Sequence, residues 1–313
     1  MDKNGLYYRQ VQLLLQVLPF VAQEDCFALK DGTAINLFVR DLPRLSVDID
    51  LVYCRENDRD EALAEIKQAL TQISETIISK IKGCHVHRAF DGKSDSLRLI
   101  VSKADVQIKV ELSPVLRGTV YPVALMEVSE AVEEEFGHVE VPVVSLADLY
   151  AGKICAALDR QHPRDLFDIK LLLENEGLTE EIRKATLVYI ISHNRPIAEL
   201  LAPKRKDLKT IYENEFANMS DREVSLDELT AAFEQLVEEL KQKLTADEKA
   251  FLLSFKCSHL KHHTPDWSLL GLDNIEHLPA VKWKQQNLNR MKSDKRQQAI
   301  DKLEKVLGLT TEG

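Results

Sequence analysis

The chain has 313 residues, a formal net charge of −10, a hydrophobic fraction of 44% and a charged fraction of 29%, which is ordinary for a globular protein with room for two domains. Its five cysteines are scattered and odd in number, which argues against a disulfide framework. The chain contains no run of about eighteen apolar residues, and residues 11–22 lack the layout of a signal peptide, so we expect a cytoplasmic protein with no membrane partner.

The first half of the chain mixes helical and strand periodicity. Pro19 is expected to end the first helix, and consecutive hairpins behind a long amphipathic helix predict a mixed sheet. The predicted helices are 6–18, 32–40 and 58–82, and the predicted strands are 26–29, 47–53, 84–90, 96–102 and 105–112.

Asp31, Gly32 and Thr33 lie between the strand 26–29 and the helix 32–40. Glycine lets the backbone approach a phosphate, threonine offers a hydroxyl, and the free N–H groups at a helix start favour an anion. This turn is therefore a candidate phosphate cradle.

Two acidic side chains, Asp48 and Asp50, lie two residues apart on the strand 47–53, so they share one face while Ile49 and Leu51 take the other. Adjacent carboxylates repel unless a cation neutralises them, which predicts a site for Mg²⁺, with Mn²⁺ as an alternative. An ordinary solvated strand is the competing interpretation. A phosphate cradle followed by such a pair is what phosphoryl or nucleotidyl transfer requires.

Two histidine groups offer weaker metal candidates. Cys257, His259, His262 and His263 lie within seven residues, but their spacing fits no standard zinc finger, so a polar loop is expected. His85 and His87 alternate on one face of the strand 84–90 and are interpreted in the same way.

Beyond Pro142 nearly every segment has helical periodicity, which places the domain boundary between domains 1–142 and 143–313. The predicted helices are 145–159, 163–175, 179–193, 206–218, 225–243, 246–256 and 293–307.

Cations and acids converge at the first two of these helices. Lys153 and Arg160 are seven residues apart and so share a helix face. Arg164 and Asp168 are four apart, and Asp165 lies beside Arg164. Such groups are costly to bury unless they are paired. If their role is structural, Arg164 and Asp168 form an ordinary i,i+4 ion pair on one helix.

The negative charge is unevenly spread, with acids dense in residues 127–140 and a basic C-terminal tail in residues 282–305. Phosphate backbones can dock on basic patches, so the tail is a candidate RNA-binding surface. Solvated helix faces are the alternative. The tail carries Lys282, Lys284, Arg290, Lys292, Lys295, Arg296, Lys302 and Lys305 against Asp294, Asp301 and Glu304.

Several of these segments resemble the AbiEii/MenT-like nucleotidyltransferases, toxins within the polymerase-β-like superfamily. The string LKDGTAINLFVRDLPRLSVDIDL is similar to the family's first motif, whose usual form is KGGTALxLxx…RxSxDIDL. The strand 107–112 and the segments 148–160 and 163–168 resemble the strand that follows and a later motif. One departure is Asp31, where the usual motif has glycine, which adds a charge beside the expected phosphate.

The resemblance implies an α+β fold, with a polymerase-β-like domain followed by a helical domain that completes the active site. It implies an NTP substrate whose triphosphate contacts Lys153. It also makes Glu111 the candidate third acid, as general base or second-metal ligand, unless Lys109 merely neutralises it on a polar strand face. The remaining residues that it implies for the nucleotide are Lys30, Gly32, Thr33, Ser46, Arg160, Arg164, Asp165 and Asp168.

The function implied is that of a toxin of a bacterial toxin–antitoxin or abortive-infection system, which transfers a nucleotide to an RNA acceptor. Better understood members modify the 3′ end of tRNA, block translation and are countered by a cognate antitoxin. Two alternatives from other classes are a catalytically silent nucleotide- or RNA-binding module and a nucleotidyltransferase acting on a small molecule such as an antibiotic. Which NTP and which acceptor are used stays open.

Overall fold

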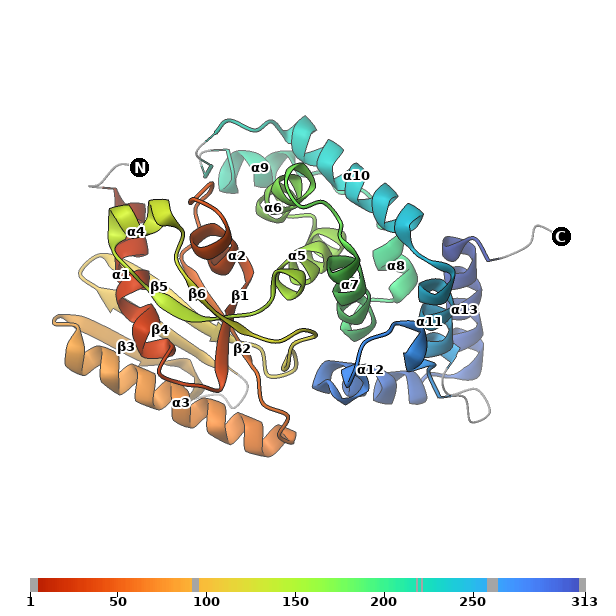
Figure 1. Ribbon diagram of the computed structural model, residues 1–313, viewed down its shortest axis with the longest axis horizontal. Helices are drawn as coiled ribbons and strands as arrows, with labels where there is room; N and C mark the ends of the chain where they lie inside the picture. Colours follow the sequence, from red (N-terminus) through yellow and green to blue (C-terminus); the bar gives the residue numbers. More distant parts are fainter. Residues whose placement is uncertain (1–4, 92–95, 218, 221, 258–263, 310–313) are drawn as a thin grey trace. The chain divides into compact units, whose positions relative to one another are not determined.

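The structure is a computed structural model that describes residues 5–91, 96–217, 219–220, 222–257 and 264–309. The chain divides into two compact units, Met1–Ser145 with Met219–Arg222, and Leu146–Asn218 with Glu223–Gly313 (Figure 1). Three of the histidines considered above, His259, His262 and His263, lie outside the described residues.

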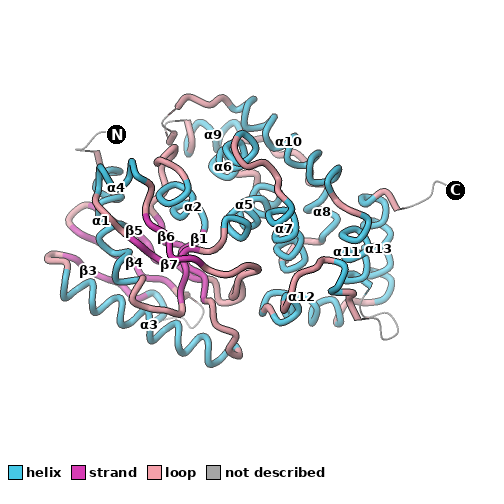
Figure 2. Tube along the Cα trace, in the orientation of Figure 1, coloured by secondary structure: helices cyan, strands magenta, loops and turns pink. Residues whose placement is uncertain are grey.

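The first unit is built on a seven-stranded sheet of order β3-β4-β5-β2-β1-β7-β6 (Figure 2). β2 pairs in parallel with β5 and antiparallel with β1, so the predicted mixed sheet and α+β class are confirmed. Two strands, β6 and β7, were missed because β6 shows no alternation of burial and β7 contains Pro142. The strands are β1 (Phe27–Lys30), β2 (Asp48–Tyr53), β3 (Cys84–Arg88), β4 (Arg98–Lys103), β5 (Val106–Leu112), β6 (Ala124–Glu127) and β7 (Glu140–Val143).

Two helices, α1 (Leu6–Val21) and α3 (Arg59–Lys80), pack against one face of this sheet (Figure 1). Alternation along β5 buries Val106, Ile108 and Val110, and each such side chain contributes about 1.5–3 kcal/mol when removed from water. The intervening side chains of β5 are therefore left on the polar face of the sheet.

The expectation that Pro19 ends the first helix was wrong, because α1 continues to Val21. Proline lacks the N–H that would bond four residues back, so the helix loses one hydrogen bond at Pro19. The N–H of Ala22 then donates to the carbonyl oxygen of Leu18 at 2.9 Å and closes the last turn.

The helix after β1 changes its winding part-way. It begins as α2 (Asp31–Ala34) and continues as the π-helical η1 (Ile35–Val39), where the N–H of Arg40 donates to the carbonyl of Ile35 at 2.9 Å. Such π segments occur frequently at functional sites.

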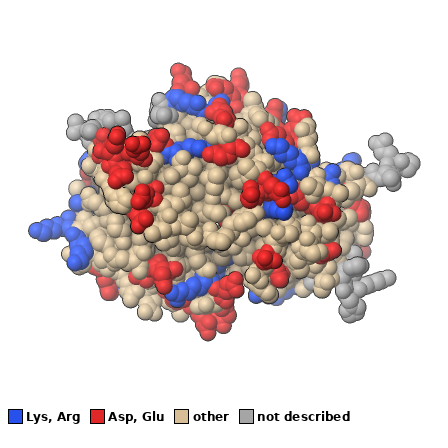
Figure 3. All heavy atoms as spheres, in the orientation of Figure 1, with Lys and Arg blue, Asp and Glu red and all other residues tan. Residues whose placement is uncertain are grey.

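A short acidic helix, α4 (Glu130–Phe136), was also not predicted. The hydroxyl of Tyr8 donates to Glu135 at 2.8 Å, and its ring lies 4.8 Å from that of Phe136. Acidic side chains gather over α4 on the face shown in Figure 3.

The regular elements in the described part of the second unit are all helices, including two short 3₁₀ turns. No helix among the described residues is long and apolar enough to cross a bilayer. Two helices, α8 and α12, were not predicted. The helices are α5 (Leu146–Arg160), α6 (Pro163–Glu174), α7 (Glu180–Ser192), α8 (Ile197–Leu201), α9 (Lys209–Glu215), α10 (Leu226–Lys243), α11 (Ala246–Cys257), α12 (Pro279–Asn289) and α13 (Ser293–Leu307).

The C-terminal tail is not one free basic surface. The buried Lys284 donates to the backbone carbonyls of residues 193–195 just beyond α7, at 2.8 Å to that of Arg195. The buried Arg296 donates to the carbonyl of Leu288 at 2.6 Å. Lys302 pairs with Glu199 at 3.0 Å. Lys284 and Arg296 thus serve the packing of the unit and Lys302 is engaged in a surface ion pair, which weakens the interpretation of the tail as a docking surface.

Replacing Lys284 with Met should lower the free energy of unfolding by about 1.5–3 kcal/mol, because three backbone carbonyl groups beyond α7 lose their charged donor. Urea-induced unfolding measures this. Lys282→Met, two residues away and exposed, is the matched control and should change stability by no more than about 0.5 kcal/mol. Equal effects of the two variants would contradict the structural role of Lys284.

Candidate functional site

A row of charged side chains crosses four neighbouring strands on the polar face of the sheet. The register pairs Lys30 of β1 with Asp50 of β2, Asp50 with Glu111 of β5, and Glu111 with Arg98 of β4. Neighbouring strands lie about 4.8 Å apart, so two carboxylates stand side by side between two cations. Asp48 lies one step along the same face, opposite Lys109.

The structure thus brings Asp48, Asp50 and Glu111 together on one face, although their roles stay predictions. The carboxylate of Glu111 pairs with Arg98 at 2.6 Å, so the alternative in which Lys109 neutralises Glu111 was wrong. Residues directly opposite each other on antiparallel strands have closely spaced Cβ atoms, which favours the cross-strand partner over one two residues away on the same strand.

Thr33 ties the start of α2 to the start of β2. Its buried hydroxyl donates to the backbone carbonyl of Asp48 at 2.6 Å and lies 3.1 Å from the hydroxyl oxygen of Ser46. The one hydroxyl hydrogen of Thr33 is thus used within the protein. Its contribution is to hold the candidate phosphate cradle beside the paired aspartates.

Gly32 lies where a side chain has no room. A Cβ atom there would be 2.8 Å from Nη2 of Arg44 and 2.9 Å from Oγ of Ser46, closer than real Cβ contacts. The carbonyl of Gly32 accepts from the side chain of Asn36 at 2.6 Å, and the backbone N–H of Arg44 donates to the same side chain at 3.3 Å. Sequence reasoning missed both Asn36 and Arg44, although each stands within the motif string.

Asp31 adopts a left-handed conformation, with φ of 64°. Glycine reaches this region without strain, and aspartate is among the few other residues that tolerate it. This backbone conformation explains why the usual motif has glycine here. The added carboxylate lies 3.9 Å from Nζ of Lys30, so the extra charge is partly offset.

Among the described residues, no three His, Cys, Asp or Glu side chains are grouped as a ready-made metal site. Magnesium does not need such a group, because it usually takes one or two carboxylates, several waters and the phosphates of its substrate. The half-buried Asp48 and Asp50 offer hard oxygen ligands of this kind. The donor set therefore fits a divalent cation that arrives with a nucleotide.

Four of the remaining predicted residues, Lys153, Arg160, Asp165 and Asp168, form an ion cluster in the second unit. Nζ of the buried Lys153 lies 3.3 Å from Asp165 and 3.4 Å from Asp168. Arg160 donates to both carboxylate oxygens of Asp165, at 2.6 and 2.9 Å. Arg164 is half-buried at the start of α6. Lys153 is thus a paired, buried lysine, and its assignment to the triphosphate stays a prediction.

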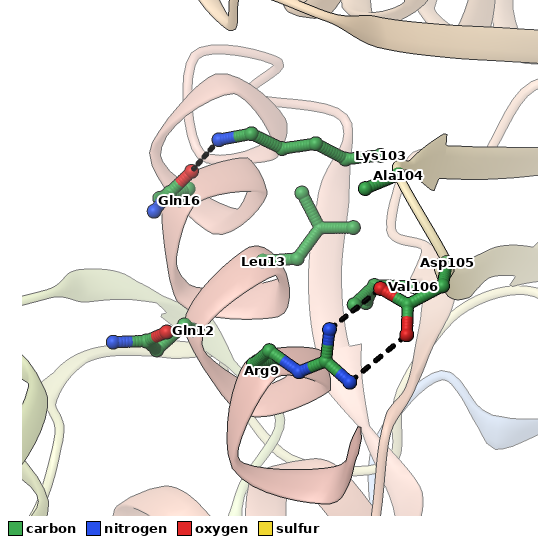
Figure 4. Close-up of a pocket in the computed structure, with 8 residues that line it drawn as sticks. All are labelled: Arg9, Gln12, Leu13, Gln16, Lys103, Ala104, Asp105 and Val106. Atoms are coloured by element: carbon green, nitrogen blue, oxygen red, sulfur yellow. Dashed lines mark hydrogen bonds and ion pairs between the residues drawn. The ribbon is translucent and has the colours of Figure 1, made fainter. Parts of the chain in front are cut away.

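A cavity of about 190 Å³ lies between α1 and the turn that joins β4 to β5 (Figure 4). Arg9 of α1 pairs with Asp105 there at 2.6 Å, and Lys103 donates to Gln16 at 3.4 Å. This cavity lies beside α1, which packs on the apolar face of the sheet. We therefore do not assign it to the paired aspartates, which are on the polar face.

Buried cysteines do not supply a nucleophile. Burial, together with nearby Glu65, raises the pKa of the Cys26 thiol to about 12. Burial likewise raises the pKa of the Cys155 thiol far above its ordinary value. Both thiols are therefore protonated at neutral pH.

A family model described as "Nucleotidyl transferase AbiEii toxin, Type IV TA system" matches residues 12–243. The chain belongs to the AbiEii toxin family. It is therefore a nucleotidyltransferase, and its membership of a toxin–antitoxin family implies an antitoxin partner. No protein with a curated description matches the chain.

The fold is also similar to a solved structure. MenT4, a nucleotidyltransferase toxin from Mycobacterium tuberculosis H37Rv, matches with a TM-score of 0.59 and 17% sequence identity, over 91% of this chain and 95% of that chain. At this identity the likeness shows the fold alone.

Gly32→Ala should destabilise this AbiEii-family protein by about 1–3 kcal/mol, because the added Cβ forces Arg44 or Ser46 to move. Gly152→Ala is the matched control. Its Cβ would make an ordinary contact at 3.7 Å with the ring of Tyr189, so this helical substitution should stabilise by up to about 1 kcal/mol. Thermal unfolding of both variants tests the pair, and a stabilised Gly32→Ala would contradict the close approach.

Lys153→Met should lower the free energy of unfolding by about 3–5 kcal/mol, because Asp165 and Asp168 would stay buried without their shared cation. Lys184→Met is the control, since Lys184 forms a surface i,i+4 pair with Glu180 at 2.8 Å worth no more than about 0.5 kcal/mol. A Lys153 variant of normal stability that transfers no nucleotide would instead support contact with the triphosphate.

Proposed function

We propose that this enzyme transfers a nucleoside monophosphate from an NTP to a hydroxyl of an RNA acceptor, the 3′ end of tRNA. The observation that carries the proposal is the hydrogen bond from Thr33 to the carbonyl of Asp48. It fixes the candidate phosphate cradle beside the paired aspartates, so one nucleotide can meet both.

The polar face of the sheet supplies a group for each part of this reaction. The backbone of Gly32 would contact a phosphate, and the half-buried Ser46 and Lys30 lie beside it as a hydroxyl and a positive charge. Asp48 and Asp50 would hold the divalent cation, Mg²⁺ or Mn²⁺. Bound there, the cation would neutralise charge on the phosphate oxygens.

Glu111 would accept the proton from the attacking hydroxyl as general base. The acceptor oxygen forms a bond to the α-phosphorus, the bond from that phosphorus to the bridging oxygen breaks, and pyrophosphate leaves. Arg98, paired with Glu111, would orient its carboxylate toward the acceptor.

Modification of the tRNA 3′ end would block aminoacylation and so inhibit translation, which accounts for toxicity. An RNA acceptor places this activity in the cytoplasm. Membership of a toxin family supports an essential target of this kind over a small molecule such as an antibiotic.

Incubation of the protein and Mg²⁺ with total tRNA and each labelled NTP in turn tests this function. Label on tRNA supports it, and identifies the nucleotide. Label on a small hydroxylated compound alone would favour the antibiotic-modifying alternative. Nucleotide binding without transfer would favour the silent module.

Asp48→Asn combined with Asp50→Asn should lower nucleotide transfer by orders of magnitude, because charge stabilisation by a bound cation contributes several kcal/mol. Growth inhibition on expression should disappear with it. Unfolding without metal should occur at the same or a higher temperature, because the double variant relieves repulsion along the row with Glu111. Glu130→Gln with Glu134→Gln, exposed acids of α4, is the control and should stay toxic. A double variant of Asp48 and Asp50 that stayed fully toxic would contradict the proposal.

A further inference from the structure

The polar face of the sheet continues beyond the paired aspartates to the edge strand β3. The register places Lys109 of β5 beside Asp48 and opposite Ile100 of β4, and Ile100 in turn lies opposite His87 of β3. The next step along the strands joins Gln107, Ser102 and His85 in the same way. One uninterrupted surface thus leads from the aspartates across three strands.

This surface is open. The side chains of His85, His87, Arg98 and Gln107 are exposed, and α1 and α3 pack on the opposite face. Within the part of the chain that the structure describes, no side chain bonds to the side chains of His85, His87 or Lys109.

The charge on this face suits a polyanion. Two of its acidic neighbours are already neutralised, since Glu111 pairs with Arg98 and Asp105 with Arg9. Lys109 remains as a cation next to the aspartates. A phosphate backbone placed along the face therefore meets Lys109 and no unpaired carboxylate of β3, β4 or β5.

The two histidines add a second element of recognition. They alternate on β3, so both rings stand on the same face of the edge strand. RNA-binding sheets stack unpaired bases on exposed aromatic side chains, histidine among them. The distance from β2 to β3 is three strand spacings, about 14 Å. If the 3′ end of the RNA reacts beside β2, the bases upstream of it would therefore reach His85 and His87.

We infer that the open face of β3, β4 and β5 binds the single-stranded 3′ segment of the RNA acceptor, with His85 and His87 stacking on its bases and Lys109 contacting its backbone. This inference rests on the proposed function, whose acceptor it places. It assigns acceptor binding to the nucleotidyltransferase unit instead of the C-terminal tail.

Fluorescence anisotropy with a labelled single-stranded RNA of tRNA 3′-end sequence, without NTP, tests the inference. His85→Ala with His87→Ala should weaken binding about tenfold or more, as the loss of base–aromatic stacking does. His85→Tyr with His87→Tyr should restore it, because a tyrosine ring stacks as histidine does. Rescue by tyrosine separates stacking from metal binding or proton transfer by histidine.

Two control variants test whether the loss of RNA affinity is specific to His85 and His87. His138→Ala removes an exposed histidine near α4, and Lys292→Gln with Lys295→Gln removes exposed cations of the tail. Both should leave RNA affinity within twofold of the wild type. Binding of a non-hydrolysable NTP analogue and the unfolding temperature should be unchanged in the His85 and His87 variants.

Unchanged RNA affinity in the alanine variant, or failure of tyrosine to rescue, would overturn the inference while leaving the proposed function intact if the wild type still labels tRNA. Greater weakening by the tail variant than by the alanine variant would also overturn it. A wild type that neither binds nor labels RNA would overturn the proposed function as well.

Discussion

The site depends on the register of β2 against its neighbours. Because side chains alternate along a strand, a shift of one residue would turn Asp48 and Asp50 into the apolar layer under α1 and expose Ile49 and Leu51. The buried apolar face therefore enforces the position of the carboxylates on the other face. Thr33 adds a second restraint, since its bond to the carbonyl of Asp48 forms only in the native register.

The charged side chains of the two units differ in how far they are buried and paired. On the sheet, carboxylates stand in a half-buried row flanked by cations, where a nucleotide and a cation can still reach them. In the second unit, Lys153, Asp165 and Asp168 are buried and mutually paired, so their charges are already compensated. The first arrangement leaves capacity for a ligand, whereas the second joins α5 to α6 through paired charges.

Much of this architecture followed from local patterns. Periods of two and 3.6 identified β2, β5, α3 and most helices of the second unit, and the spacing of Asp48 and Asp50 placed both on one face of a strand. Elements with weak patterns were missed, including β6, whose side chains are mostly exposed, and β7, which contains a proline.

Other features were not predictable because they depend on contacts distant in sequence. The pairing of Arg98 with Glu111 requires the register of β4 against β5, and the burial of Lys284 requires the end of α7 beside α12. Nothing in the local sequence distinguishes Lys284 from its exposed neighbour Lys282. Charge counts along a segment therefore overstated the basic surface of the tail.

Asp31 has a consequence for how related chains are recognised. The position needs a left-handed backbone, and only the next one, Gly32, needs the absence of a side chain. A search pattern that demands two consecutive glycines treats these separate requirements as one and would pass over this chain. A pattern that accepts aspartate or asparagine first, and insists on glycine second, would retrieve diverged members whose cradle is intact.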